Sequence, residues 1–199
     1  MDKRDFLFKF LPKTIRNQIK LDDEALYSVT DQQTADKITT ELLKFVPANA
    51  IVTDGTACIG GNTFSLSRSF RFVNAVELEP TKYRYLKHNM KIFGVDNVAC
   101  YKGDILDYVA VLEQSLLFLD PPWGGPEYKS KTSVELSLSG FPLEEVCLRF
   151  APYTAYIAIK TPTNFNIDPF VAKTQTYMTL VYTNTKLRKL CLYVFAVTK

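Results

Sequence analysis

Hydrophobic and polar residues along the chain follow two periods, one typical of strands and one typical of helices. Short apolar runs predict buried strands over residues 50–54, 72–77, 98–101, 116–119 and 153–159. Apolar residues at helical spacing predict helices over residues 31–45, 62–68, 80–93 and 143–150. The last two runs, 178–183 and 190–197, are rich in β-branched and aromatic residues and predict a hairpin with its turn at 184–186.

Capping residues mark the ends of two of these helices. Thr30 is predicted to cap the first helix, with Gln33 at its third position. Pro80 and Gly94 are predicted to bound the third helix, because proline suits a first helical position and glycine suits a C-terminal cap. Strands that alternate with helices and end in an antiparallel pair indicate an α/β fold, with a mostly parallel seven-stranded sheet covered by helices on both faces.

The composition of the 199 residues is that of an ordinary globular protein, with 47% hydrophobic and 23% charged residues. No apolar run approaches the roughly 18 residues that a membrane-spanning helix needs, and charge interrupts the N-terminus too often for a secretory signal. The four cysteines lie far apart and there is a single histidine, so a zinc site is not predicted. We therefore expect one intracellular domain with reduced thiols, without a metal and without a membrane contact.

Positive charge is concentrated at the N-terminus. The net charge is +3, and the first twenty residues contribute six basic and two acidic side chains. Phe6, Phe8 and Phe10 are interleaved with these basic residues. Such a segment could follow a phosphate backbone, or it could pack its rings on the domain and leave a solvated basic face. The two interpretations are compatible, and both stay open.

Acidic residues follow four successive predicted strands: Asp54, Glu77, Asp104 and Asp120. Because ligands of an open α/β sheet bind beyond the carboxyl ends of its strands, we expect these acids to share one site. After Asp54, the turn GTACIGGNT (55–63) contains glycines that let the main chain approach a ligand, and the helix that follows offers free amides. Taken singly, such an acid is better explained by a structural role, Asp54 as a helix cap, Glu77 as a surface acid and Asp104 as a turn residue, but four acids at successive strand ends rarely arise by accident.

The ligand that suits this arrangement is an adenosine with a small polar tail. Glu77, about twenty residues after the turn, is placed to accept from two ribose hydroxyls, and Asp104 is placed to accept from the adenine amine. The phosphate loop G-x-x-x-x-G-K-[ST] is absent, which disfavours hydrolysis of nucleoside triphosphates. Thr56 and Cys58 occupy the first two glycine positions of a dinucleotide loop, so S-adenosylmethionine (SAM) fits better than NAD.

The fourth strand ends in Asp120-Pro121-Pro122-Trp123, which contains the only tryptophan. The pattern [DNS]-P-P-aromatic is the signature of methyltransferases that act on planar amino groups. The Asp120 carboxylate and the Pro121 carbonyl are expected to accept the two N–H bonds of such an amine, and Trp123 is expected to stack on the base. Indole is the best aromatic partner for a cation, so Trp123 suits a positively charged 7-methylguanine; the alternative is a residue that only seals the site.

The longer motif DPPWGGPEY resembles the trimethylguanosine synthases, the RNA cap guanine-N2 methyltransferases, and the resemblance covers almost the whole chain. Residues 19–30 (IKLDDEALYSVT) resemble the family's IKLD…E…[FY]SVT segment, and residues 54–63 (DGTACIGGNT) resemble its DxFCGxGGNT motif. Further similar stretches are 76–82 (VELEPTK) with Asn89, Gly103-Asp104, 164–168 and 184–189. The SVT, GGNT and PPWGGP motifs are specific in combination, and PPWGGP alone separates this group from the DPPY-type DNA and ribosomal-RNA enzymes.

The resemblance implies a Rossmann-like class I methyltransferase fold, SAM as the cofactor and capped RNA as the substrate. The enzyme would methylate the exocyclic N2 amine of 7-methylguanosine (m7G) in the RNA 5′ cap, giving a di- or trimethylguanosine cap. Residues 1–27 are expected to be a basic extension that helps to close the active site of a methyltransferase domain over 28–199. We expect a monomer that acts in RNA processing, in the nucleus or cytoplasm of a eukaryotic or virus-infected cell.

The implied site residues fall into three groups, and no metal ligand is among them. The residues expected to bind the cofactor are Asp54, Thr56, Gly60, Asn62, Thr63, Glu77, Asp104 and Asp120. The residues expected to perform the reaction are Asp120, Pro121 and Trp123. The residues expected to bind the substrate are Ser28, Trp123, Asn89, Lys129 and Lys160.

Two departures from the family pattern change these expectations. Cys58 replaces a glycine of the cofactor turn, and residues 161–164 (TPTN) stand where the family tends to have Pro-Arg-Asn. Lys160, Lys129, Lys131 or the basic N-terminus would then have to bind the cap phosphates. The alternative functions are another RNA or DNA amino-methyltransferase, acting on ribosomal-RNA guanine N2 or adenine N6, and a cap-binding protein without turnover. Asp120 argues against the last, because stacking alone needs no amine acceptor.

Overall fold

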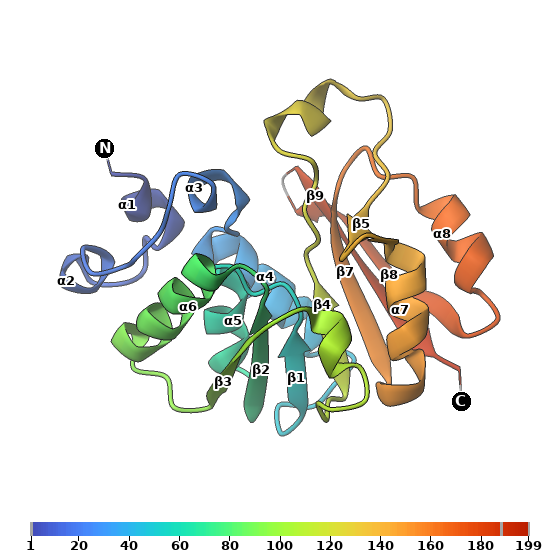
Figure 1. The fold of residues 1–199 in the computed structure, drawn as a ribbon, viewed down its shortest axis with the longest axis horizontal. Helices are drawn as coiled ribbons and strands as arrows, with labels where there is room; N and C mark the ends of the chain where they lie inside the picture. Colours follow the sequence, from blue (N-terminus) through green and yellow to red (C-terminus); the bar gives the residue numbers. More distant parts are fainter. Residues whose placement is uncertain (1, 188, 199) are drawn as a thin grey trace. The chain divides into compact units, whose positions relative to one another are not determined.

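A computed structural model describes residues 2–187 and 189–198 of the chain. It contains the predicted seven-stranded sheet, with strand order β3-β2-β1-β4-β7-β9-β8 (Figure 1). Its strands are β1 (Ile51–Asp54), β2 (Phe72–Glu77), β3 (Val98–Lys102), β4 (Leu116–Leu119), β7 (Tyr156–Pro162), β8 (Met178–Leu187) and β9 (Leu190–Val197). β2 is parallel to β1 and β3, β4 is parallel to β7, and β9 is antiparallel to β7 and β8. The predicted fold class is therefore confirmed.

The chain divides into two compact units, Met1–Ile105 and Leu106–Lys199. The first unit contains β1–β3, and the second contains β4 and β7–β9. Residues 1–27, predicted as a separate extension, belong to the first unit, and their role at an active site stays a prediction. The 3₁₀ helix η1 spans Ile105–Tyr108.

Six helices lie in the described part of the first unit: α1 (Lys3–Leu7), α2 (Lys13–Arg16), α3 (Ala25–Ser28), α4 (Gln32–Leu42), α5 (Gly61–Ser67) and α6 (Pro80–Phe93). α6 has its predicted bounds. The Glu79 carboxylate accepts from two N–H groups of its first turn, Pro80 occupies the first position, and Gly94 ends the helix with φ +72°. α5 packs on β1 and β2, and α6 packs on β2 and β3.

The predicted start of α4 was one residue early. Asp31 caps the helix, because its carboxylate accepts from the N–H of Thr34, three residues on. Asp31 also accepts from the Thr34 hydroxyl at 2.7 Å. Thr30 serves a different contact, since its hydroxyl oxygen accepts from the Asn62 side chain at 3.1 Å.

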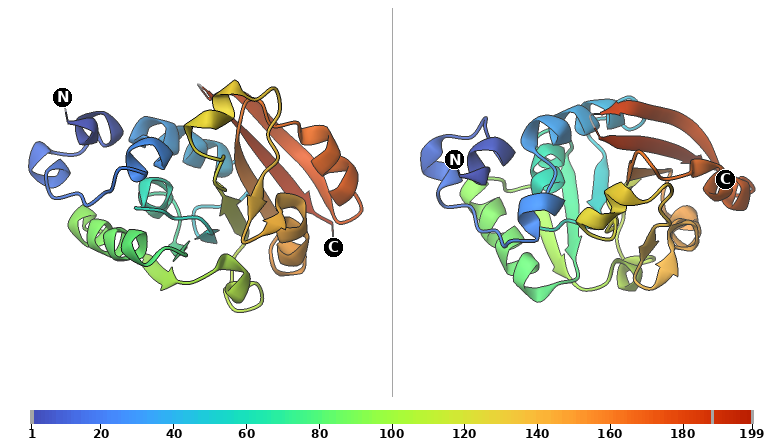
Figure 2. Two further views of the ribbon diagram at one scale, coloured as in Figure 1. Left: turned by 45° about the horizontal axis from the view of Figure 1, so that its top comes forward. Right: turned by 90° about the horizontal axis from the view of Figure 1, so that it is seen from above.

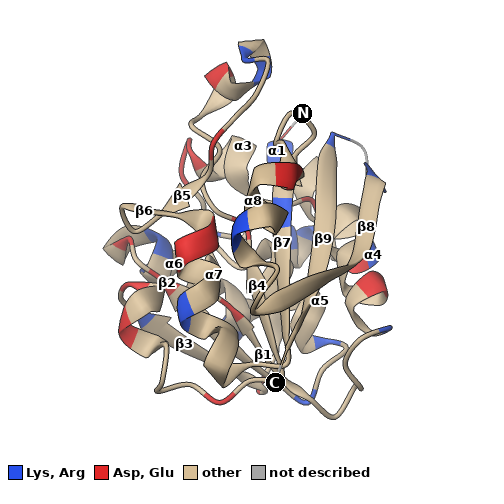
Figure 3. Ribbon diagram, turned by 90° about the vertical axis from the view of Figure 1, so that its right-hand side faces the viewer, with Lys and Arg blue, Asp and Glu red and all other residues tan. Residues whose placement is uncertain are grey.

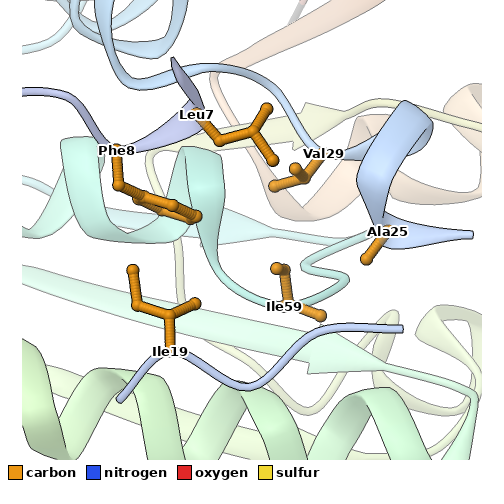
Figure 4. Packing of buried hydrophobic residues seen from close by; sticks show 6 residues of the cluster. All are labelled: Leu7, Phe8, Ile19, Ala25, Val29 and Ile59. Carbon is orange, nitrogen blue, oxygen red and sulfur yellow. The ribbon is translucent and has the colours of Figure 1, made fainter. Parts of the chain in front are cut away.

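A small apolar cluster packs the N-terminal helices against the rest of the first unit. Figure 2 shows α1 and α2 beside α6. Figure 4 shows the six buried residues of the cluster, which come from the N-terminal 29 residues and from the loop after β1: Leu7, Phe8, Ile19, Ala25, Val29 and Ile59. Phe8 also contacts Phe93 of α6, with ring centroids 5.7 Å apart. The segment before α4 is therefore an integral part of the unit's core.

The second unit contains α7 (Leu143–Phe150), α8 (Ile167–Thr174), the 3₁₀ helices η2 (Pro126–Ser130) and η3 (Ala151–Tyr153), and the short pair β5 (Ser137–Leu138) and β6 (Phe141–Pro142). α7 has its predicted bounds. β7 begins at Tyr156, later than predicted, because residues 151–153 form η3. β8 continues through residues 184–186, where the turn was predicted, and the hairpin contains register shifts. Sequence analysis missed α8, whose N-cap Asn166 accepts from the N–H of Asp168.

Across residues 2–187 and 189–198, no helix combines the length and the apolar character that a membrane crossing requires.

Candidate active site

Asp54 ends β1 and is completely buried. Its Oδ2 accepts a hydrogen bond of 2.7 Å from the Thr63 hydroxyl, and its Oδ1 accepts one of 3.3 Å from the Thr56 N–H. The structure thus brings together three residues predicted to bind the cofactor. Through these contacts Asp54 fixes both ends of the turn that leads from β1 into α5.

Glu77 ends β2 and holds the middle of the same turn. Its Oε2 accepts from the Cys58 N–H and its Oε1 accepts from the Glu79 N–H, both at 2.8 Å. Burial raises the pKa of this carboxyl above its usual value of 4.5, and the two N–H groups oppose the rise only in part. Each oxygen keeps a further lone pair. Glu77 is therefore a fixed pair of acceptors, suited to two neighbouring hydroxyl groups.

Cys58 adopts the left-handed backbone conformation, with φ +50°. This conformation costs roughly 1–2 kcal/mol for a residue with a Cβ, which explains why a glycine suits this position. Burial, followed by the charge of Glu77, raises the pKa of the Cys58 thiol to about 12. The thiol is therefore neutral near pH 7 and is not an activated nucleophile.

The two glycines of the GGNT sequence allow close packing around the turn. Gly60 has φ +100°, and a Cβ on it would lie 2.3 Å from Met90 Cε. A Cβ on Gly61 would lie 2.6 Å from Val29 Cγ2 and 2.8 Å from the Thr30 carbonyl oxygen. Gly61 therefore lets the segment before α4 lie directly on the start of α5.

Asn62 joins this segment to the turn and has a spare acceptor. It is 8% exposed, and its Nδ2 donates to the Thr30 hydroxyl at 3.1 Å. Its Oδ1 is buried and has no hydrogen-bond partner within the described residues. A buried acceptor of this kind is costly unless something donates to it, so Asn62 Oδ1 is a candidate ligand contact.

The predicted substrate residues Ser28 and Asn89 both lie in the first unit. Ser28 is exposed, and its hydroxyl lies 3.9 Å from the Cys58 Sγ atom. Asn89 is fully buried in α6. Its Oδ1 accepts from the Lys20 N–H, and its Nδ2 donates to the carbonyl oxygens of Lys20 and Ile59, at 2.9–3.0 Å. These bonds make Asn89 a clamp on the N-terminal segment, and its contact with a substrate stays a prediction.

Asp104 follows β3 beside the end of β2. Gly103 has φ +153°, a value that favours glycine, and its N–H donates to the Glu77 carbonyl oxygen at 3.1 Å. Asp104 is half-buried. The three acids predicted for the cofactor in this unit therefore lie at the ends of the neighbouring strands β1, β2 and β3.

In the second unit, Asp120 directly follows β4, and Lys160 lies in the neighbouring strand β7. Because Leu119 pairs with Ile159, residues 120 and 160 are opposite each other. Lys160 Nζ lies 2.5 Å from Asp120 Oδ2, and the two side chains are 5% and 12% exposed. Lys160 is the one basic residue of β7, and Figure 3 shows the basic residues of the chain in blue and the acidic residues in red along the ribbon. Each buried charge is tolerated because the other neutralises it.

The half-buried Trp123 lies against the same lysine. Lys160 Nζ is 4.9 Å from the centroid of the indole ring, within cation–π range. The Trp123 Nε1 atom is buried and lacks a hydrogen-bond partner within the described residues. The structure thus brings the predicted catalytic residues Asp120 and Trp123 into contact with one cation, which had been predicted to bind phosphate.

Tyr128 is a site residue that sequence reasoning did not assign. Its ring meets Trp123 edge-on, with centroids 5.1 Å apart and an interplanar angle of 84°. Asn164 fixes its position, because the Asn164 side chain donates to the carbonyl oxygens of Tyr128 and Lys131, both at 2.9 Å. The signal was present in the sequence: Pro126 begins η2, which turns the chain back toward the tryptophan. Lys129 is exposed, with Nζ 5.9 Å from the Tyr128 ring.

Comparison with known proteins decides the family. A family model described as RNA cap guanine-N2 methyltransferase matches residues 26–194, a range that includes every candidate residue named above from Ser28 to Asn164. The chain belongs to this cap guanine-N2 methyltransferase family. It is 31% identical over 162 residues to the trimethylguanosine synthase of Schizosaccharomyces pombe, a match that covers 77% of this chain and 67% of that protein.

The chain is also similar to a viral protein and, in fold, to a solved structure. Uncharacterized protein L320 of Acanthamoeba polyphaga mimivirus is 27% identical over 198 residues, which cover 86% of this chain and 77% of that protein. A proposed methyltransferase from Porphyromonas gingivalis W83 has the same fold, with a TM-score of 0.66 and 12% identity over 89% of this chain; the match spans 43% of that longer chain. Family and fold together support methyltransferase activity of the SAM-dependent kind.

Proposed function

We propose that this cap guanine-N2 methyltransferase family member transfers a methyl group from SAM to the exocyclic N2 amine of m7G in an RNA 5′ cap, giving a di- or trimethylguanosine cap. The observation that supports this proposal best is the cluster at the end of β4, where a buried carboxylate and an indole ring share one ammonium group. A carboxylate next to an aromatic plate on a proline-stiffened turn suits an amine on a planar base.

The first unit contains the groups that a SAM molecule needs. Glu77 offers two fixed acceptors for the ribose hydroxyls, Asp104 an acceptor for the adenine amine, and Asn62 Oδ1 an acceptor for the ammonium group. Gly60 and Gly61 let the turn pack closely on α6 and on the segment before α4. When bound, SAM supplies an electrophilic methyl group on a sulfonium sulfur.

In the second unit, Asp120 and the Pro121 carbonyl oxygen would accept the two N–H bonds of the substrate amine. These bonds orient the nitrogen and stabilise the positive charge that develops on it, and much of the rate then comes from positioning. Asp120 need not be a strong base, since the proton departs after the methyl group has transferred. Lys160 holds one carboxylate oxygen in place, so it positions Asp120 for this task.

Trp123 would stack on the base and favour m7G over guanine, because the methylated base carries a positive charge. The ammonium of Lys160 is engaged with Asp120 and the indole, so we assign the cap phosphates to other basic residues. Lys129 and Lys131 are exposed near the Tyr128 turn and are the better candidates. Lys129 and Lys131 would take the place of the arginine that the family tends to have where this chain has residues 161–164 (TPTN).

The test is mass spectrometry of cap dinucleotides incubated with SAM. The m7G-capped dinucleotide should gain one or two methyl groups, and the unmethylated cap should gain none. Trp123→Ala should remove most activity and the preference for m7G, whereas Trp123→Phe should keep part of both, and SAM affinity should stay close to wild type in each. Equal use of the two caps would contradict the proposal. Transfer into uncapped RNA or DNA alone would indicate another amino-methyltransferase, and SAM binding without any transfer would indicate a cap-binding protein.

A further inference from the structure

The N-terminal arm, residues 2–20, is rich in exposed basic side chains. Its two arginines are paired within the arm, Arg4 with Asp2 at 3.4 Å and Arg16 with Asp5 at 3.3 Å. The four lysines of the arm are exposed, and within the described residues none forms an ion pair: Lys3, Lys9, Lys13 and Lys20. The acids at positions 22–24 follow directly and bound this basic region.

Two aromatic rings are exposed among these lysines. Phe8 is 1% exposed and packs in the core, whereas Phe6 and Phe10 on either side of it are 50% and 59% exposed. Lys9 Nζ lies 4.8 Å from the centroid of the Phe10 ring and also donates to the Gln33 side chain. Phe8 already supplies the apolar contact that packing of the arm requires. Phe6 and Phe10 therefore each keep at least half of their surface exposed, where a ligand can contact it.

The arm is a fixed scaffold. Leu7, Phe8 and Ile19 are buried in the cluster around Ile59 (Figure 4). The Phe10 N–H donates to the Gln32 side chain at 3.0 Å, and Asn89 binds both the N–H and the carbonyl oxygen of Lys20. A ligand on the arm would therefore meet a surface that is already ordered, which lowers the entropy cost of binding.

From these observations we propose that the arm binds the single-stranded RNA that follows the cap, with the four lysines on phosphates and with Phe6 and Phe10 as stacking platforms for bases. This inference rests on the proposed function, because it takes capped RNA as the substrate. Unpaired bases stack on aromatic side chains whatever their sequence, and lysines between such rings follow the backbone. Duplex RNA keeps its bases stacked inside and would leave Phe6 and Phe10 unused.

The test compares two substrates of the full chain that differ only in RNA length. One is the m7G-capped dinucleotide, and the other carries the same cap on a single strand of about 16 nucleotides. The wild-type KM should be at least about tenfold lower for the longer RNA, and its affinity should fall with salt with a log–log slope of about −3, the value for four phosphate contacts on a single strand. Equal KM values for the two substrates would overturn the proposal.

Variants of the arm make the test specific. Replacing the four arm lysines by glutamine should raise KM for the long RNA most of the way to that for the dinucleotide and leave kcat/KM for the dinucleotide unchanged. Phe6→Ser with Phe10→Ser should raise KM for the long RNA several-fold. The control replaces four other exposed lysines by glutamine, Lys37, Lys102, Lys186 and Lys189, and should leave KM for the long RNA close to wild type.

The outcomes separate this inference from the proposed function. Wild-type failure to methylate the capped dinucleotide would contradict the proposed function. Loss of RNA affinity that is equal in the control and the arm variant would show that net charge, and not the arm, binds RNA, and would overturn the inference alone. Fluorescence anisotropy with labelled RNA gives the affinity without any need for turnover.

Discussion

The two units each present a carboxylate at the end of a strand, but they hold it in different ways. In the first unit, Glu77 is held by two main-chain N–H groups, those of Cys58 and Glu79. In the second unit, Asp120 is held by a side chain, the buried ammonium of Lys160. The difference follows from position, because Glu77 lies next to the N–H groups of Cys58 in the turn and of Glu79 just after β2, and Asp120 lies opposite a lysine on the next strand.

These two kinds of support suit the two acids to different partners. Main-chain N–H groups fix the two oxygens of Glu77 in place, and burial keeps the pKa of its carboxyl raised, so it suits neutral hydroxyl partners. A full positive charge next to Asp120 compensates its negative charge in a buried place. Asp120 therefore suits a neutral amine that it orients through a hydrogen bond, and the ion pair with Lys160 holds the carboxylate in place for that contact. The two sites should therefore respond differently when the support of each acid is removed.

The largest effect is expected from removing Asp120. Asp120→Ala should lower turnover on the capped dinucleotide about 100-fold or more, the loss typical for one transition-state hydrogen bond, a much larger loss than its effect on SAM affinity. It should also lower the free energy of unfolding by about 3 kcal/mol, because it leaves the Lys160 ammonium buried without its partner. Single-turnover kinetics and urea unfolding measure the two effects.

Pairing this change with Lys160→Met separates the two effects. The double variant has no unpaired charge, so it should recover most of the lost stability while turnover stays low. Lys160→Met alone should lower kcat by disturbing Asp120, and Lys160→Arg should restore part of the activity because it restores the ion pair. Equal stability of Asp120→Ala and wild type would show that the pair is not a buried unit.

A smaller effect is expected at Glu77, where the support is main chain. Because the pKa of Glu77 is raised above 4.5, SAM affinity should fall as pH drops through that raised value, since a protonated carboxyl loses acceptor capacity. The stability of the free protein should respond in the opposite direction: Glu77 stabilises the fold at low pH, and this contribution is lost as pH rises through its raised pKa. Calorimetry of SAM binding and thermal unfolding over the same pH series measure both.

Glu77→Gln should lower SAM affinity about tenfold or more at neutral pH, the cost of weakening hydrogen bonds to a charged group. It should also abolish the further fall in SAM affinity at low pH. Glu79→Gln is the matched control, because hydrogen bonds from the Thr81 and Lys82 N–H groups lower the pKa of Glu79. That variant should keep the acid-side loss of affinity. An acid-side loss that survives in Glu77→Gln would assign the titration to another group.

Local patterns in the sequence were enough to predict the bounds of those helices and strands that neighbouring residues determine. β2, α6 and α7 have the predicted bounds because strand periodicity, Pro80 and Gly94 act within a few residues of each other. Lys160 was predicted only as a phosphate ligand, because its contact with Asp120 depends on strand register across forty residues. The exposed Phe6 and Phe10 beside a buried Phe8 were likewise undecided, since tertiary packing alone selects the ring that is buried.

The smallest expected effect tests how the turn holds Glu77. Cys58 donates one of the two supporting N–H bonds from a left-handed conformation with φ +50°. Cys58→Gly should be more stable than Cys58→Ala by about 1 kcal/mol, because both remove the thiol and glycine alone removes the backbone strain. The melting temperatures should then differ by about 2–4 °C. SAM should bind Cys58→Gly as tightly as wild type, since the N–H to Glu77 is kept.

Ser139, the other non-glycine residue with positive φ among those described, provides the control at +57°. Ser139→Gly and Ser139→Ala should show a similar difference in stability, but neither should change SAM affinity. Weaker SAM binding by Cys58→Ala than by Cys58→Gly would show that the turn conformation, and with it the main-chain support of Glu77, sets cofactor affinity. Equal stability of the two Cys58 variants would mean that the turn relaxes without cost. The turn would then not hold the Glu77 carboxylate in place, just as Asp120 would lose its support without Lys160.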